Sequence, residues 1–242
     1  MSRLAEAFAR AKASGQPGLV TYVTAGDPTL ARTAGVLRAL DRAGATVIEV
    51  GVPFSDPLAD GPVIQRATER ALASGTTLDG VLDLLASIRA DISAGLVIFS
   101  YANPILRLGA ETFADRAKAA GVDGVLVLDL PLEEAGEFKA LLAARGIDTI
   151  LLLSPTTSDE RLRKAASVGS GFLYAISRLG DHADERAASH GGIGPSTNFS
   201  DMLGFGDAET QRHRQVGHLS YPPHHVFRSV SQRVAGSGHA ET

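Results

Sequence analysis

The 242-residue sequence contains no cysteine and no tryptophan, and only two methionines. Without thiols the chain forms neither disulfides nor zinc sites with thiolate ligands, a composition typical of a reducing compartment such as the cytoplasm. Histidine is also absent from residues 1–181, so that all seven histidines lie between 182 and 239. An excess of positive charge is missing too, because the formal net charge is −4, which indicates neither a nucleic-acid-binding nor a membrane-surface protein.

Long apolar runs are missing as well, since none approaches the roughly 20 residues that a membrane-spanning helix needs. The first 15 residues mix charges with Leu4 and Phe8 at helical spacing, and we therefore expect no signal peptide. The hydrophobic content of 44% is sufficient for a folded core. These features together predict a soluble, cytoplasmic protein without a membrane or nucleic-acid partner.

Short runs of Val, Ile and Leu alternate with segments of helical periodicity up to about residue 176. This alternation predicts repeated βα units on a parallel sheet. Six strands are expected, at residues 18–25, 46–50, 95–101, 124–131, 148–154 and 171–177. Helices are expected between them; Asp27 would cap the first, Pro28 would open it, and Thr157 and Glu160 have the spacing of a capping box. Six units are two fewer than an eight-stranded barrel needs.

The regular pattern stops near residue 180. Residues 181–242 contain paired glycines and prolines and no run of four or more core-type apolar residues. We therefore divide the chain into a βα core at 1–180 and an atypical, irregular tail at 181–242, with the last two βα units absent or degraded. The tail histidines lack the spacing of a metal-binding motif, so no metal site is predicted.

Carboxylates gather where the second predicted strand ends. Glu49 lies at the end of this strand, and Asp56 and Asp60 lie in the following loop. A carboxylate buried at the end of a parallel strand loses solvent, which raises its proton affinity toward the range of a general acid or base. For Glu49 this role and an outward-turned charge are both open. For Asp56 and Asp60 the alternative is a turn-forming or helix-capping residue.

Asp129 repeats this placement near the end of the fourth predicted strand, where it either orients a ligand or holds a loop. Aromatic residues also fall at or near strand ends, namely Tyr22, Phe54, Tyr101, Phe172 and Tyr174. Such residues either line a flat apolar pocket or pack in the barrel core, and core packing is favoured for Phe172.

Five segments, taken together, closely resemble the tryptophan synthase α subunit family. They are TYVTAGDP at 21–28, IEVGVPFSDPLADGPVIQRA at 48–67, SYANPIL at 100–106, GVLVLDLP at 124–131 and GFLYAISRLG at 171–180. The resemblance covers about residues 1–180 and implies an α/β fold of the (β/α)8 TIM-barrel type. It also implies a carbon–carbon lyase of tryptophan biosynthesis, which cleaves indole-3-glycerol phosphate to indole and glyceraldehyde 3-phosphate by a retro-aldol reaction.

The resemblance also implies roles for individual residues. Glu49 would be the acid/base that protonates the indole ring carbon, and Asp60 would bind the indole N–H and stabilise the positive charge that develops there. The predicted substrate-binding residues are Tyr22, Phe99, Tyr101, Asp129 and Tyr174. The predicted contacts to a β subunit are Pro53, Asp56 and Pro131. An α2β2 heterotetramer is expected, with no cofactor in this subunit, because pyridoxal phosphate belongs to the β subunit.

The tail departs from this family. Family members continue with a Val-Thr-Gly loop and two further strands that bind the substrate phosphate, whereas Asp181 follows Gly180 here and only Gly204–Asp207 resembles one of those glycine turns. Three interpretations stay open: an α-type lyase of intact or reduced activity, a non-catalytic partner that binds and activates the β subunit, and a defective frameshifted product. A six-stranded sheet would also leave two unpaired edges unless the tail or a partner covers them.

Overall fold

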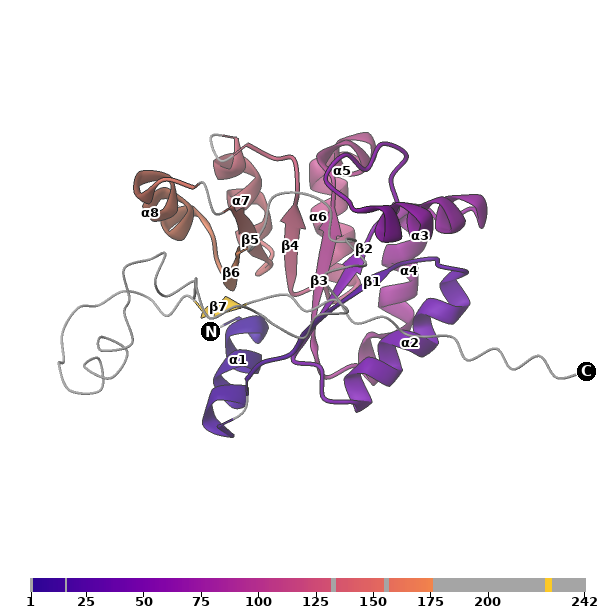
Figure 1. Ribbon diagram of the computed structural model, residues 1–242, viewed down its shortest axis with the longest axis horizontal. Helices are drawn as coiled ribbons and strands as arrows, with labels where there is room; N and C mark the ends of the chain where they lie inside the picture. Colours follow the sequence, from indigo (N-terminus) through magenta and orange to yellow (C-terminus); the bar gives the residue numbers. More distant parts are fainter. Residues whose placement is uncertain (1, 16, 132–133, 155–156, 176–224, 228–242) are drawn as a thin grey trace, which may run out of the picture.

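A computed structural model of the protein describes residues 2–15, 17–131, 134–154, 157–175 and 225–227. Within these residues, the strands form one parallel sheet in the order of the sequence (Figure 1). The strands are β1 (Val20–Thr24), β2 (Val47–Gly51), β3 (Gly95–Ser100), β4 (Gly124–Val127), β5 (Asp148–Leu153), β6 (Phe172–Ala175) and β7 (His225–Phe227). The helices are α1 (Arg3–Ala13), α2 (Leu30–Arg42), α3 (Pro62–Ala73), α4 (Leu78–Ile88), the 3-10 helix η1 (Arg89–Asp91), α5 (Ala102–Leu108), α6 (Ala110–Ala119), α7 (Ala135–Ala143) and α8 (Asp159–Val168).

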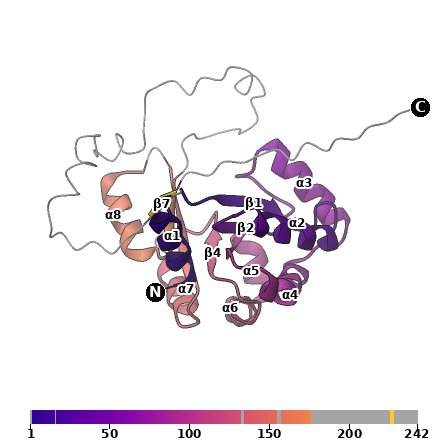
Figure 2. The same ribbon diagram turned by 90° about the horizontal axis from the view of Figure 1, so that it is seen from below.

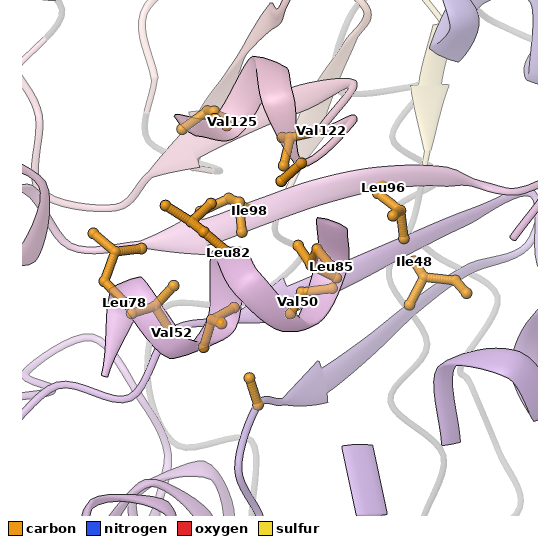
Figure 3. Packing of buried hydrophobic residues seen from close by; sticks show 14 of the residues in the cluster. Ile48, Val50, Val52, Leu78, Leu82, Leu85, Leu96, Ile98, Val122 and Val125 are labelled. Carbon is orange, nitrogen blue, oxygen red and sulfur yellow. The ribbon is translucent and has the colours of Figure 1, made fainter. Parts of the chain in front are cut away.

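The outer face of the sheet is covered by amphipathic helices. In α4, the side chains of Leu78, Leu82 and Leu85 recur at helical spacing and are buried. They pack against outward-facing residues of β2 and β3, including Ile48 and Ile98 (Figure 3). Burial of each such side chain contributes about 1.5 to 3 kcal/mol, so this layer holds the strands in place beneath the helices.

The inner face of the sheet encloses a second apolar cluster, which α1 closes from one end. Leu4 and Phe8 of α1 are buried there together with one residue from each of β1 to β6. The strand residues are Val20, Val47, Val97, Leu126, Ile150 and Phe172. The helix lies at the amino-terminal ends of the strands, as two views of the ribbon show (Figures 1 and 2). The sheet thus curls around a packed interior, as in a partial barrel.

Strand register decides which residues reach that interior. Tyr22 of β1, Glu49 of β2 and Val97 of β3 are register partners in neighbouring strands. Because side chains alternate between the two faces of a strand, Glu49 lies on the same inner face as Val47, while Ile48 and Val50 face the outer helices. One carboxylate therefore enters an otherwise apolar interior.

The boundaries of several elements differ from those expected from the sequence. Asp27 does not cap α2, because the hydroxyl of Thr29 accepts the N–H of Arg32 and Asp27 instead pairs with Arg70 of α3. The capping box at Thr157 is also wrong, since Ser158 is the residue that caps α8. β4 ends four residues earlier than expected, at Val127.

Residues His225–Phe227 of the tail form β7, which pairs in parallel with β6. The edge of the last predicted strand, β6, is therefore covered by a segment of the tail, which is one of the two alternatives that the sequence allowed. Apart from these three residues, the predicted irregular tail and its histidines lie outside the described residues. Among the described strands, β1 pairs only with β2, so the sheet is not closed there.

Within the described ranges, no single helix is long and apolar enough to cross a membrane. Only α3 and α4 with η1, taken together across an 89° bend, reach the length and apolar content of a membrane span.

The packing of α1 against β3 can be tested at Leu4 and Gly95. A Cβ added at Gly95 would collide with Leu4, so Gly95→Ala is expected to lower the free energy of unfolding by about 1 to 3 kcal/mol. Leu4→Ala is expected to lower it by about 2 to 5 kcal/mol. The double variant should lose clearly less than the sum, because the shortened side chain leaves room for the new methyl group. Urea unfolding measures all three values.

Gly35→Ala on α2 is the matched control, because nothing lies within 4 Å of a Cβ at that position. It is expected to leave the stability unchanged or slightly higher. Additive losses in the double variant would contradict the proposed contact between α1 and β3.

Candidate active site

Glu49 is the most deeply buried carboxylate on the inner face. Its side chain lies in the middle of β2 with 1% of the residue exposed, and its Oε1 atom has no hydrogen-bond partner. Burial raises its pKa from 4.5 to about 8. At neutral pH the group therefore holds a proton that it can give to a bound molecule. The outward-turned alternative for Glu49 is wrong.

Tyr22 lies beside Glu49 on the neighbouring strand. Its hydroxyl occupies the space where a side chain at Gly51 would otherwise stand, so the glycine makes room for the ring. The hydroxyl accepts a hydrogen bond from the Thr24 hydroxyl at 3.5 Å. Burial, with smaller contributions from Asp60 and Glu49, raises the pKa of Tyr22, which therefore remains a neutral hydroxyl group.

Three aromatic rings meet above the apolar interior. The ring of Phe99 lies 5.2 Å from that of Tyr22, at an interplanar angle of 77°. It lies 6.4 Å from the ring of Tyr174, at 64°. Tyr22, Phe99 and Tyr174 come from β1, β3 and β6, so the strands bring together three predicted substrate-binding residues from across the sheet. Phe172 packs against Phe8 in the core, as favoured from the sequence.

The loop after β2 brings Asp60 toward the same end of the sheet. Burial raises the pKa of Asp60, and its interaction with the Tyr101 hydroxyl opposes this rise only in part. Tyr101 also accepts the N–H of Ala59 at 2.9 Å. The loop is held from its other side by the Gln65 amide, which donates to the Asp60 carbonyl at 2.9 Å.

Asp129 serves a structural purpose in this arrangement. Its Oδ1 accepts the N–H of Ala102 at 2.7 Å, so it holds the first turn of α5. Of the predicted partner contacts, Asp56 and Pro131 are exposed, whereas Pro53 is buried. The loop also carries Leu58, which is 94% exposed.

Two parts of this site carried no signal of their own in the sequence. Gly51 stands in the segment 48–67 without any predicted role, yet it makes the space for Tyr22. The contact of Tyr101 with a backbone N–H depends on the fold of the loop. A glycine two residues after an inward-facing acid would have been the available clue. The glycine turn at 204–207 lies outside the described residues.

Residues 8–191 match the family of the tryptophan synthase alpha chain. This chain belongs to that family. The alpha chain of Polynucleobacter asymbioticus is 51% identical over 181 residues, which cover 74% of this chain and 68% of the relative. The alpha chain of Geobacter sulfurreducens is 51% identical over 180 residues, with the same coverage.

Solved structures agree with this assignment. Tryptophan synthase subunit alpha from Legionella pneumophila has a TM-score of 0.70 at 40% identity, covering 73% of this chain and 68% of that one. A tryptophan synthase complex from Pyrococcus furiosus has a TM-score of 0.63 at 44% identity, covering 65% of each. The predicted α/β fold of the TIM-barrel family, with six readable strands, is confirmed, as is membership of this lyase family.

The tryptophan synthase alpha chain match ends at residue 191, so five of the seven histidines lie beyond it. The matched part of this chain spans about two thirds of the relatives' length. The comparisons therefore identify the segment that carries Glu49 and Asp60.

Replacing the Glu49 carboxyl by an amide is expected to raise the stability of the fold in a pH-dependent way. The unfolded Glu49 ionises near pH 4.5 while the folded one holds its proton to about pH 8, so the free energy of unfolding falls as pH rises between these values. Glu49→Gln removes this loss and is expected to be more stable than the parent, by an amount that grows by about 3 kcal/mol from pH 4.5 to pH 7. Urea unfolding at several pH values measures the difference.

Glu111→Gln, on the exposed face of α6, is the control and should follow the parent at every pH. Parallel pH dependence of Glu49→Gln and its parent would show that Glu49 is not buried as a neutral acid.

Proposed function

We propose that this chain cleaves indole-3-glycerol phosphate to indole and glyceraldehyde 3-phosphate. The single observation that carries the proposal is the buried carboxyl of Glu49 beside Tyr22, whose Oε1 has no hydrogen-bond partner and which holds its proton at neutral pH. An acid of this kind suits protonation of a carbon atom in an apolar ring. Membership of the tryptophan synthase alpha chain family supports the choice of substrate.

The reaction needs two proton transfers and one bond cleavage. Glu49 gives its proton to the indole ring carbon that bears the side chain, and the ring nitrogen becomes positively charged. The side-chain hydroxyl then gives its proton to the Glu49 carboxylate, which restores the acid, while the carbon–carbon bond breaks and its electron pair returns to the ring to give indole and an aldehyde. Asp60 accepts the ring N–H and stabilises the positive charge, an interaction that is stronger in a site shielded from water.

The aromatic residues would bind the flat indole ring. Tyr22, Phe99 and Tyr174 offer ring faces and edges on three strands, and Tyr101 adds a fourth ring nearby. Asp129, which holds α5, would act on the substrate only through the position of that helix. Because no electron is gained or lost in the reaction, its chemistry needs no redox cofactor.

The proposed activity predicts a loss of turnover in Glu49→Gln. An amide cannot donate a proton as the carboxylic acid does, so kcat is expected to fall by about 10² to 10⁴-fold. Asp60→Asn is expected to lose about 10 to 10²-fold, because it keeps the shape but removes the negative charge. Indole release from indole-3-glycerol phosphate is the measurement, with Glu111→Gln as the control of unchanged activity. Retained turnover in a folded Glu49→Gln would overturn the assignment.

The same acid predicts a basic limit to the reaction. Because burial raises the pKa of Glu49 to about 8, the acid form is present below that pH and is lost above it. We expect kcat/KM to fall on the alkaline side with a midpoint near 8, and Glu49→Gln to lack this limb. A pH profile that continues flat to pH 10 would contradict Glu49 as the acid.

We also propose an α2β2 assembly with a β subunit that carries pyridoxal phosphate. The Pyrococcus furiosus relative is described as an a2b2 complex with mutual activation. In this chain, Leu58 is 94% exposed beside a groove of about 360 Å³ that includes Phe54, Asp56 and Leu72. Leu58 together with the neighbouring Phe54 and Leu72 offers apolar surface that a partner could bury. This surface also supports the second candidate function, a partner that binds and activates the β subunit without catalysis.

The interface is tested with Leu58→Asp. Placing a charge where an apolar anchor would be buried is expected to weaken β-subunit binding by at least tenfold. Leu19→Asp is the matched control, because Leu19 is 45% exposed and precedes β1 at the opposite end of the sheet. Equal binding by both variants would exclude this loop from the interface. Binding and β-subunit activation without indole release would favour the non-catalytic partner.

A further inference from the structure

Tyr101 directly follows the carboxyl-terminal end of β3, where its backbone is held in place. It lies between β3 and α5 with 5% of the residue exposed. The Ser100 hydroxyl donates to its carbonyl at 2.9 Å. On the other side, Asp129 holds the N–H of Ala102. The backbone on both sides of Tyr101 is therefore held by side-chain hydrogen bonds.

The side chain of Tyr101 contacts both ends of the loop after β2. Its ring lies 5.2 Å from that of Phe54, at an interplanar angle of 36°, near the beginning of the loop. Its hydroxyl accepts the N–H of Ala59 at 2.9 Å near the end of the loop. The same hydroxyl also interacts with the Asp60 carboxylate, and this interaction opposes part of the rise in the carboxyl pKa that burial causes.

The hydrogen bond from Ala59 restricts the direction of the hydroxyl proton. A phenol has one proton and can accept as well as donate. Because the oxygen accepts from Ala59, and the Asp60 carboxylate can only accept when ionised, the proton points to Asp60. One hydroxyl thus fixes a backbone group and the carboxylate of the next residue, which leaves the Asp60 side chain little freedom to turn away from the pocket.

We propose that the Tyr101 hydroxyl is a positioning group, which holds the Asp60 carboxylate in place for the substrate through its bonds to Ala59 and Asp60. This role rests on the proposed lyase function and goes beyond ring packing against the indole. The two parts of the side chain have separate roles: the ring packs on Phe54 and holds the loop, and the hydroxyl orients the Asp60 carboxylate.

Tyr101→Phe separates these tasks, because it keeps the ring and removes the hydroxyl. We expect kcat to fall about tenfold, the effect of losing one hydrogen bond to a charged group, while KM changes less than twofold. Loss of the donor also raises the pKa of Asp60 further, because the ionised form loses its partner. The acid limb of the pH profile is therefore expected to move to higher pH. Tyr101→Leu, which lacks the ring as well, should also raise KM.

Gln65→Leu is the comparison variant, because Gln65 holds the backbone of the same loop but does not contact the Asp60 carboxylate. It is expected to leave the acid limb where it is. A shift of the limb in Gln65→Leu equal to that in Tyr101→Phe would show that loosening the loop is sufficient and would overturn the role of the hydroxyl.

NMR titration of the Asp60 carboxyl carbon tests the proposal without catalysis. A higher pKa of Asp60 in Tyr101→Phe than in the parent supports the hydroxyl contact, and an unchanged pKa overturns it. If the parent chain releases no indole yet Asp60 shifts in this way, the proposed lyase function fails while the positioning contact stands. If the parent is active and Tyr101→Phe keeps its kcat and pH profile, the positioning role fails alone.

Discussion

The burial of one carboxyl group within a parallel sheet is the constraint on which the site depends. Glu49 is surrounded by apolar strand residues, and its Oε1 has no partner among the described residues. Such a group is stable there only as the neutral acid, since a charge without a partner would cost several kcal/mol. The cost of burying this group is offset by the two apolar layers, one on each face of the sheet, which keep β2 in position. The raised pKa of Glu49 thus depends on the packing of both faces of the sheet.

The rim of the sheet adds a second carboxylate in a different environment. Asp60 lies on a loop, is only partly buried and has a hydroxyl donor, so its ionised form is better supported than that of Glu49. Two acids with unlike surroundings can take different roles in one reaction, one as proton donor and the other as a fixed negative charge. Glu49 and Asp60 are eleven positions apart in the chain, and the loop between them also carries the exposed Leu58, so the proposed partner surface and Asp60 lie on one short segment.

Much of this arrangement could be predicted from the sequence, because periodicity and strand endings are local properties. The runs around Glu49 and Phe99 predicted β2 and β3, and the acid within such a run predicted a buried carboxylate. Contacts that depend on loop geometry could not be predicted. Asp27 had every local feature of a helix cap, but Arg70 from another helix pairs with it and Thr29 caps α2 instead. The aromatic cluster required the register of distant strands, and Phe99 was named only through resemblance to a family.

The packing of α1 has a consequence for the order of folding. Phe8 meets Phe172 with ring centroids 5.3 Å apart, although 164 positions separate them in the chain. During synthesis, α1 therefore finds this partner only after β6 has been made. Until then, the apolar face of α1 has an incomplete binding site, and contacts of such long sequence separation slow folding because the intervening chain must first be ordered. Apolar surface that stays exposed on a nascent chain in this way favours aggregation.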